Sequence, residues 1–331
     1  MIARRSVWSD PQVQALLKSF VVSADEVNRL QSGKDPECRL AQKVFEQGHY
    51  AGRTKPTNTR QGIYATAPSG VMLASINAND PKAVAGMLQR ALDKWNTLSE
   101  TERMQAGDPS ADTSKVNRPE NRYPADGLVL RVFSRDLPRD KQPHDWRADA
   151  WNQDYAWFRG EEARSLLPAK LAKGEKASAP DALIRRLAKL NFVDNVRGQT
   201  TAYSDEDIQT AVLESEVVRV ADGIATVKLR GATHTHREGV WAIEGFKDMQ
   251  APGKHELELE VKLFGTAEFD TAKSKFVSFE VLAVGTRSGA TQYNGRHDDV
   301  EPAPIGFYLT LAGDTPAEHV APAFYWSYGW R

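Results

Sequence analysis

The sequence has 331 residues, of which 40% are hydrophobic and 26% are charged, and its formal net charge is -1. The hydrophobic content excludes a disordered chain, and the length is sufficient for two modest domains. The nearly balanced charge gives no reason to expect a basic surface for nucleic acid. No apolar run is long enough to cross a membrane, and a single cysteine, Cys38, excludes an intramolecular disulfide. We therefore expect a soluble protein without nucleic-acid binding or membrane insertion, cytoplasmic as written and exported if a signal peptide precedes Met1.

The first part of the chain begins with two capped helices. Residues 10–20 start with Asp10 as the N-cap and Pro11 at the first helical position, and their apolar residues form one stripe. A second helix is predicted over residues 36–47, because the apolar periodicity stops there at a glycine. Between the two helices, the apolar run 20–24 predicts a β-strand.

A β-hairpin and a third helix follow. Residues 62–66 and 71–76 are β-branched and apolar runs, and they are joined by a Pro-Ser-Gly turn. Asn79 or Asp80 then caps a helix that continues to Trp95 with apolar residues at helical spacing. A hairpin followed by a packing helix is the arrangement that ends a thioredoxin-like domain.

Five segments of this region carry a family resemblance: VWSDPQV, FVVSADE, EQGHY, TRQGIYATAPSG and the helix ending in ALDKW. They are similar to a divergent thioredoxin-like domain found in uncharacterised bacterial proteins of planctomycete type. The resemblance implies a thioredoxin-like domain over residues 1–98. In longer relatives a strand and a Cys-x-x-Cys helix start precede the segment that matches 5–8, and Arg60-Gln61 stand here where the family has a cis-proline. The resemblance therefore implies a thioredoxin-like fold that lacks one interior strand and has no dithiol chemistry.

A polar stretch separates this domain from the rest. Residues 99–121 are rich in Asp, Pro, Ser and Gly without apolar periodicity, which predicts a linker. In the second domain, 122–331, we expect a strand at 127–133, a loop at 134–139 and a helix at 181–190 after a proline.

Beyond residue 214 the hydrophobic pattern has the period of two that is typical of strands. The predicted strands are 216–220, 224–229, 255–263, 276–284 and 305–311. In HELELEVKL the leucines and the valine are expected to face the core and the charged residues water. We predict an α+β protein whose second domain is an antiparallel sandwich or open barrel. The segments GTRSGATQYNGRHDD and PAPIGFYLTLAGD resemble regions that accompany the thioredoxin-like domain in the same proteins.

Two aromatic regions stand out in this domain. Residues 146–158 hold three tryptophans, a tyrosine and a phenylalanine, and the ending 323–331 holds five more aromatic residues. Such a cluster can stack sugars or bases, but without a basic groove core packing is the favoured interpretation. We expect the ending to pack against the sheet or against 146–158.

Cys38 is the candidate thiol. It lies near the start of the helix 36–47 and beside Arg39, and both features would lower the pKa of a thiol. A single thiol cannot perform dithiol exchange, so we favour a structural cysteine over a reactive or sensing one.

His234 and His236 are candidate metal ligands. If their segment is a strand, both imidazoles lie on one face, and His297 or its acidic neighbours could complete a site. The alternative, which we favour, is that these histidines face solvent or form hydrogen bonds. No cofactor is predicted apart from this possible metal.

The polar loop 285–299 and the pair Arg60-Gln61 are candidate ligand or partner surfaces. In the loop the residues of interest are Arg287, Tyr293, Asn294 and Arg296. Arginines beside flexible glycines could bind a small anion or a sugar. We favour internal ion pairs between Arg and Asp, and expect the same of 134–139 and 194–198.

These observations favour a non-catalytic thioredoxin-like binding or scaffolding protein whose partner, a protein or a small ligand, is unknown. Two enzymatic alternatives stay open. One is a thiol-disulfide oxidoreductase whose Cys-x-x-Cys lies upstream of a truncated start. The other is a metal-dependent enzyme that uses His234, His236 and His297.

Overall fold

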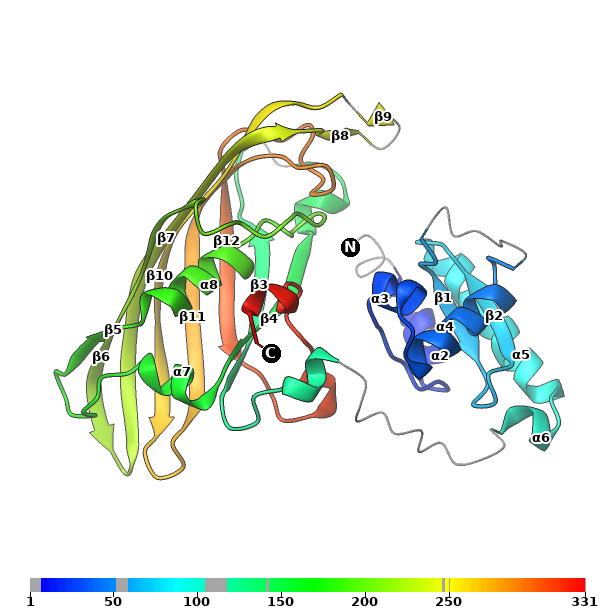
Figure 1. Ribbon diagram of the computed structural model, residues 1–331, viewed down its shortest axis with the longest axis horizontal. Helices are drawn as coiled ribbons and strands as arrows, with labels where there is room; N and C mark the ends of the chain where they lie inside the picture. The colour runs from blue at the N-terminus through cyan, green and yellow to red at the C-terminus, as the bar shows by residue number, and fades with distance from the viewer. Residues whose placement is uncertain are drawn as a thin grey trace. The chain divides into compact units, whose positions relative to one another are not determined.

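The structure is a computed structural model that describes residues 7–51, 59–104, 118–140, 143–245, 248–249 and 251–330. The chain divides into two compact units, Met1–Asn117 and Arg118–Arg331, and the division falls inside the segment predicted to be a linker (Figure 1). Among the described helices, none has the length and apolar content needed to cross a membrane.

The first unit consists of short helices around one β-hairpin. Its elements are α2 (Pro11–Leu17), α3 (Val27–Ser32), α4 (Pro36–Gln47), β1 (Ile63–Thr66), β2 (Met72–Ile76), α5 (Pro81–Thr97) and α6 (Glu100–Arg103). Asp10 caps α2 by accepting hydrogen bonds from the backbone of Gln12 and Val13. Asp80, rather than Asn79, caps α5. Helices α2 and α5 therefore begin where the capping residues predict, and α4 has the predicted bounds 36–47.

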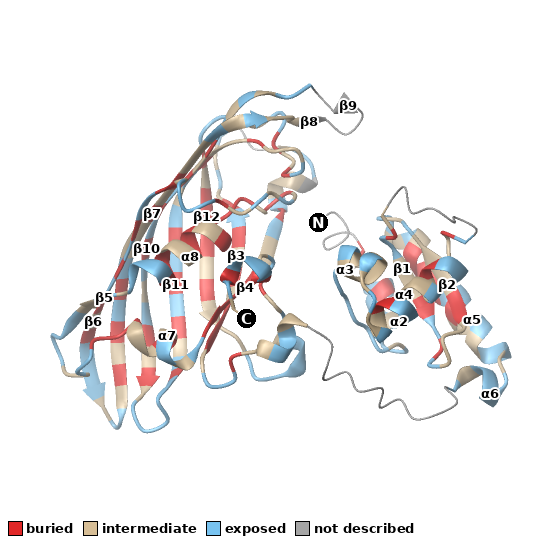
Figure 2. Ribbon diagram, viewed as in Figure 1, coloured by how far each residue is buried: buried red, intermediate tan, exposed pale blue. Residues whose placement is uncertain are grey.

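The core of the first unit lies between α5 and the hairpin. The strands pair antiparallel, with Ile63 opposite Ile76. Val84, Met87 and Leu88 of α5 are buried against this hairpin, together with Val13 of α2 (Figure 2). The apolar stripe of α5 and the hairpin that precedes it are as the sequence predicts.

The strand predicted at 20–24 does not form. These residues lie outside any sheet, and Val21 and Val22 are exposed to solvent. A strand needs a neighbour that satisfies its backbone N–H and C=O groups, and within the described residues of this unit only β1 and β2 pair. The described part of the unit is therefore a hairpin with helices.

The predicted linker begins with an ordered turn of helix. Ser99 and Glu102 form a capping box at the start of α6. The backbone N–H of Ser69 donates to the carbonyl of Arg103 at 3.2 Å, and the guanidinium of Arg103 lies 5.0 Å from the ring centre of Trp95. Residues 99–103 thus belong to the first unit, and 105–117 lie outside the described residues.

The second unit is built on one large antiparallel sheet. Its elements are η2 (Pro119–Arg122), β3 (Leu128–Asp136), η3 (Trp146–Asp149), β4 (Trp151–Phe158), α7 (Gly160–Ser165), β5 (Lys176–Ser178), α8 (Asp181–Leu190), β6 (Ile208–Ala221), β7 (Ile224–Trp241), β8 (Glu244–Gly245), β9 (Asp248–Met249), β10 (Gly253–Asp270), β11 (Lys275–Gly289), β12 (Ala303–Leu311), η4 (Pro316–Glu318) and η5 (Tyr325–Tyr328).

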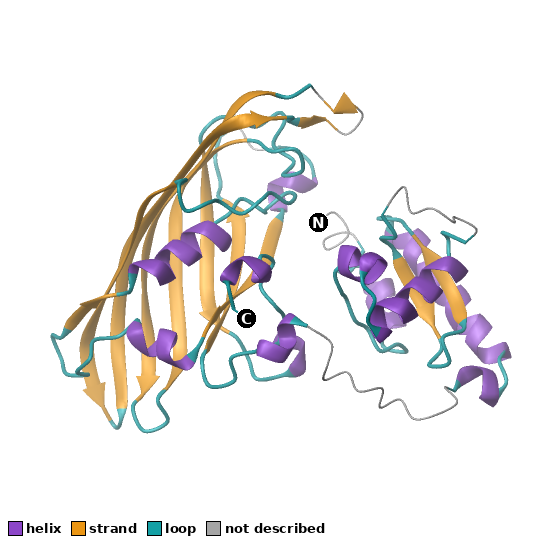
Figure 3. Ribbon diagram, in the orientation of Figure 1, coloured by secondary structure: helices purple, strands orange, loops and turns teal. Residues whose placement is uncertain are grey.

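Of the two predicted architectures, an antiparallel sandwich or an open barrel, the sandwich is wrong, whereas the antiparallel sheet common to both predictions is present. Eight strands pair in the order β4-β3-β12-β11-β10-β7-β6-β5, so this sheet is open, with β4 and β5 at its edges, and β8 and β9 form a separate two-stranded sheet. The sheet curves around α7 and α8, which lie on one of its faces (Figures 1 and 3). One layer of helices on a curved sheet buries the apolar face that a second sheet would otherwise cover.

Alternation along the strands gives the sheet an inner and an outer face. Leu257, Leu259, Val261 and Leu263 are buried, whereas Glu256, Glu260 and Lys262 are exposed, which confirms the prediction for this strand. The inner face and the apolar side of α8 form one core cluster. The outer face carries the charged residues of β7 and β10.

The strands are longer than predicted because inner-face glycines do not end them. Gly285 pairs with Val261, and a Cβ at position 285 would lie 1.8 Å from the carbonyl oxygen of Glu260. The glycine therefore permits two long strands to approach where the sheet bends. Asp222 and Gly223, both with positive φ, close the two-residue turn between β6 and β7.

The C-terminal segment covers the edge strand β4, as the sequence predicts. Tyr325 and Tyr328 of η5 are buried against Trp157 and Tyr155 of β4. The backbone N–H of Trp157 donates to the hydroxyl of Tyr328 at 3.4 Å. Because Leu128 and Phe158 face the inner core, β3 and β4 are buried on both faces. The side chain of Trp146 lies outside the described residues.

We predict that Gly285→Ala lowers the free energy of unfolding of the second unit by about 1–3 kcal/mol, because the added methyl group has no space beside Glu260. Urea unfolding followed by tryptophan fluorescence measures this loss. Gly313→Ala is the matched control, since its Cβ would meet only the Cγ of Glu318 at 3.6 Å. Equal midpoints for the two variants would show that close strand approach does not depend on this glycine.

Candidate functional site

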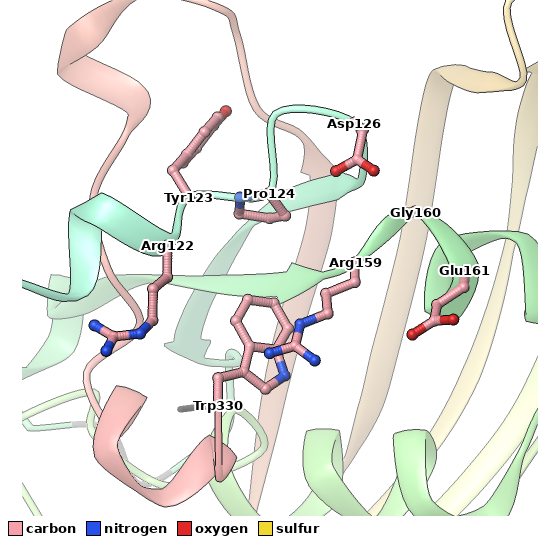
Figure 4. Close-up of a pocket in the computed structure, with 8 residues that line it drawn as sticks. All are labelled: Arg122, Tyr123, Pro124, Asp126, Arg159, Gly160, Glu161 and Trp330. Atoms are coloured by element: carbon pink, nitrogen blue, oxygen red, sulfur yellow. The ribbon is translucent and has the colours of Figure 1, made fainter.

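A pocket of about 470 Å³ opens at one end of β3 and β4 in the second unit (Figure 4). Its lining residues are Arg122, Tyr123, Pro124, Asp126, Arg159, Gly160, Glu161 and Trp330. They come from three segments: the end of η2 with the loop that leads into β3, the junction of β4 with α7, and the C-terminal segment. A volume of this size suits a small organic ligand.

Gly127 brings the first two of these segments together. A Cβ at this position would lie 1.9 Å from the carbonyl oxygen of Phe158, the last residue of β4. Only a glycine permits this approach, which places the loop before β3 beside the start of α7. The Gly127 backbone N–H also donates to the carbonyl of Pro124 at 2.9 Å, so the loop is a tight turn.

Trp330 forms an aromatic wall of the pocket. Its ring packs edge-to-face against Tyr328, with ring centres 5.5 Å apart, and lies 6.3 Å from Trp157. The guanidinium of Arg159 lies 4.7 Å from the centre of the Trp330 ring, a cation–π contact that Figure 4 shows. The Trp330 ring therefore packs against buried aromatic residues of the protein, and the guanidinium of Arg159 lies over it at the pocket.

A second arginine supports the same ring from within the fold. Arg186 of α8 lies 5.5 Å from the Trp330 ring centre and forms an ion pair with Glu162 at 2.8 Å. Burial alone would raise the pKa of Glu162, but the hydrogen bonds from Arg186 outweigh it and hold the pKa below its ordinary value. The charge of Arg186 is thus compensated inside the protein.

The charges of the pocket itself are separated. Arg122 and Arg159 lie toward one side, whereas Asp126 and Glu161 lie toward the other (Figure 4). Within the described residues, Arg159 forms no ion pair with a carboxylate. The lining thus combines two guanidinium groups, two carboxylates and an indole, which are groups that can bind a charged or aromatic ligand.

The structure places Cys38 in the core of the first unit, away from solvent. Its thiol donates to the side chain of Asp35 at 3.1 Å and lies 3.3 Å from the carbonyl of Arg29. Burial and the Asp35 hydrogen bond raise the pKa of Cys38. The expectation of a lowered thiol pKa at this helix start is therefore wrong, because desolvation and the Asp35 hydrogen bond outweigh the charge of Arg29, which lies beside the thiol.

Arg60 is buried, so it does not form the exposed surface that the sequence suggests. Its guanidinium forms an ion pair with Glu46 at 3.2 Å and lies 5.1 Å from the ring centre of Tyr50. The Arg60 carbonyl accepts a hydrogen bond from the hydroxyl of Tyr64 at 2.7 Å. Gln61 is exposed, and its carbonyl accepts from Tyr50. Arg60 therefore fixes the entry to β1.

Arg296 is also buried, at the centre of an ion-pair network. Its guanidinium donates to both carboxylate oxygens of Asp136, at 2.7 and 2.8 Å, and to both oxygens of Asp194, each at 2.8 Å. This bidentate geometry uses the whole planar fork of the side chain. The internal pairs that the sequence favours are formed.

Asp299 gathers the other arginines of the same network. Its carboxylate lies 2.8 Å from the guanidinium of Arg287, 2.7 Å from that of Arg197 and 2.5 Å from that of Arg139. Arg287 is buried and also donates to the carbonyl oxygens of Asp299 and Glu301. Arg287 and Arg296 are thus enclosed by protein and do not line a surface.

The two remaining loop residues have opposite surroundings. Asn294 is fully buried and accepts a hydrogen bond from the backbone of Thr291 at 3.0 Å. Tyr293 is exposed, while its carbonyl accepts from the backbone of Gln199. The loop is therefore packed onto the segment that follows α8, with one aromatic side chain left outside.

The predicted three-histidine metal site does not form. His234 and His236 share the outer face of β7, as the sequence predicts, and pair with Glu258 at 2.7 Å and Glu256 at 3.8 Å. His297 is exposed on the loop after β11 and belongs to no group of metal-ligating side chains in the described chain. The strand register sets the first two histidines beside carboxylates instead.

Sequence reasoning missed Arg122, Arg159 and Trp330 as site residues. Trp330 belongs to a recognisably aromatic ending, and Arg159 directly follows the aromatic strand. Arg159 and Trp330 meet because the C-terminal segment covers β4, where Tyr328 contacts Trp157 from 171 residues further along the chain. No local pattern carries that information.

Comparison of the chain with family models, with curated proteins and with solved structures finds no match in any of the three.

We predict that Cys38 reacts slowly with the thiol reagent DTNB in the native protein, because its thiol is buried and its pKa is raised. Absorbance at the reporter band measures the rate, and denaturant should release full reactivity. Val21→Cys supplies the control, since position 21 is exposed and should react at once. A native Cys38 as fast as the thiol at position 21 would contradict the placement.

We predict that acid weakens the second unit through Asp136 and Asp299. Burial alone would raise each pKa, but hydrogen bonds from Arg296 to Asp136, and from Arg139 and Arg287 to Asp299, lower both below the ordinary value. Lowered folded-state pKa values stabilise the protein above the unfolded pKa of about 4, and this stability is lost as the pH falls through the folded values. Urea midpoints should therefore fall as the pH drops below about 4.

The matched variants are Asp136→Asn and Asp314→Asn. Asp136→Asn should cost about 3–5 kcal/mol near neutral pH, because it leaves buried Arg296 and Arg197 with one carboxylate fewer. It should also flatten the acid dependence. Asp314 is exposed in the loop after β12, so its variant should match wild type. Similar losses in the two variants would refute the importance of the network.

Proposed function

We propose that the protein is a non-catalytic binding protein whose second unit holds a small ligand with an anionic group next to a flat apolar part. The observation that carries the proposal is Arg159 over the face of Trp330 at the pocket, with no carboxylate partner in the described part of the chain. A guanidinium at a pocket recognises carboxylate or phosphate through paired N–H donors. The indole beside it offers a surface on which a ring can stack.

The other lining groups refine the ligand. Asp126 and Glu161 lie on the side away from Arg122 (Figure 4). Carboxylates accept hydrogen bonds, so they favour hydroxyl or ammonium groups at the end of the ligand away from its anion. A ligand with one anionic end and a donor-rich opposite end fits this separation of charge.

For the first unit we propose a degenerate thioredoxin-like domain that acts as a scaffold. The order of α2, an extended segment, α3 and α4, the β1-β2 hairpin and α5 supports this proposal, as does the sequence resemblance. Cys38, the single cysteine, is buried and hydrogen-bonded, which is suited to a structural role. The unit would then contribute binding surface or stability rather than redox chemistry.

The prediction for the pocket uses phenyl phosphate, which joins a flat ring to an anion, as the probe. Calorimetric titration of the full chain should show binding that is tighter than for inorganic phosphate or for benzyl alcohol, because the probe uses both Arg159 and Trp330. Arg159→Gln and Trp330→Ala should each weaken binding by about tenfold or more, equivalent to about 1.4 kcal/mol.

Arg219→Gln is the matched control, since Arg219 is exposed on β6 and lies outside the pocket. It should bind the probe as wild type does. Absence of phenyl phosphate binding at about 10 mM, a concentration that detects even very weak affinity, would reject this ligand class. Equal affinity in wild type and Arg159→Gln would reject the site.

A further inference from the structure

The outer face of the sheet carries a group of side chains with the donor types of a metal site. The ligand atoms of His236, Glu238 and Glu256 all lie within 4.8 Å of one another. The three residues come from the neighbouring strands β7 and β10, near the end of β7 that leads to β8. They are separate from the pocket, which lies at the ends of β3 and β4.

The sheet itself holds the three residues in place. His236 and Glu238 are two positions apart on β7 and therefore point to the same face, and Glu256 of β10 lies directly opposite Glu238. The backbone N–H of His236 donates to the carbonyl of Asp207 at 2.8 Å, so position 236 is bonded on both sides. Only side-chain rotation is needed to bring the three ligand atoms to one ion.

The charges of the cluster are unbalanced in a way that favours a cation. Glu238 and Glu256 are like charges in directly opposed positions, an arrangement that destabilises a sheet. Within the described residues, neither carboxylate forms an ion pair with a lysine or arginine. Lys254 lies on the same face two residues before Glu256 and still makes no such pair. A bound divalent cation would remove this repulsion.

The neighbouring residues His234 and Glu258 bind each other, so they are not counted among the ligands. Glu258 lies opposite His236, but its carboxylate is bonded to His234 at 2.7 Å. One imidazole and two carboxylates suit a first-row divalent ion such as Zn²⁺, whereas Mg²⁺ and Ca²⁺ prefer all-oxygen surroundings. Zinc bonds of about 2 Å require the three atoms to draw somewhat closer, which exposed glutamates can do.

We propose that His236, Glu238 and Glu256 bind one divalent transition-metal ion on the outer face of the sheet, with Zn²⁺ as the representative ion. The site differs from the three-histidine arrangement suggested by the sequence, since His297 is not part of it. It also stands independently of the proposed ligand pocket, because it shares no residue with it.

Titration of the full, metal-free chain with ZnCl₂ tests the proposal. Calorimetry should show one zinc ion per chain, and His236→Ala and Glu238→Gln should each weaken zinc binding about tenfold or more. MgCl₂ should give no comparable signal. His144→Ala is the control, because His144 is an exposed histidine outside the cluster and its loss should leave zinc affinity unchanged.

A second measurement separates loss of binding from loss of folding. Without metal, Glu238→Gln should unfold at the same or a slightly higher temperature than wild type, since it removes a like-charge pair. Added zinc should raise the unfolding temperature of wild type and of His144→Ala, but not that of Glu238→Gln. Equal zinc affinity in wild type and His236→Ala, or no binding at about 1 mM zinc, would overturn the proposal.

Discussion

The edge of strand β4 that pairs with no other strand is the constraint on which the second unit depends. An open sheet ends in a strand whose outward N–H and C=O groups need partners, and an unprotected edge invites pairing with other chains. Here α8 and the C-terminal segment supply hydrogen-bond partners for the backbone of that edge. Arg186 donates to the carbonyl of Trp157, and Asn191 donates to the carbonyl of Tyr155. The hydroxyl of Tyr328 accepts from the backbone N–H of Trp157. The same closure places Trp330 beside Arg159 and so builds the pocket wall.

The opposite end of β3 is fixed by charge instead of by aromatic packing. Asp136 closes the strand and meets Arg296 and Arg197, while Asp299 meets Arg139 and Arg287. Burying such groups costs several kcal/mol per ion, which is offset only where each charge has good partners. The network joins β3, the segment after α8 and the loop after β11, and it thereby fixes the positions of three segments that are far apart in the sequence. The candidate zinc residues lie on the outer face of β7 and β10, away from both the cover of β4 and the ion-pair network.

The sequence predicted the elements whose causes are local. The helix at 181–190 agrees with α8 at both ends, because Pro180 precedes it and its leucines form one side. The alternation in β10 likewise predicts its buried residues, since a strand has two faces. By contrast, Val21 and Val22 resemble a strand, but no described neighbour pairs with them. Strand character is local, whereas strand pairing is not.

The candidate site was predictable only in part for the same reason. Arg296 is recognisable as an unusual residue, but its partners lie 102 and 160 residues away, and that distance decides between a buried pair and a ligand surface. His234 and His236 share a face by alternation alone, while the strand register decides that carboxylates, not His297, lie beside them. Trp330 and Arg159 meet because the chain ending covers β4.

A crystal structure of the full chain with phenyl phosphate tests the central claim most directly. The account predicts the phosphate within hydrogen-bonding distance of the Arg159 guanidinium and the phenyl ring against Trp330. It also predicts the same β4 edge contacts as in the free protein, because the pocket is built by the fold. An empty pocket in a crystal that binds the probe elsewhere would contradict the account.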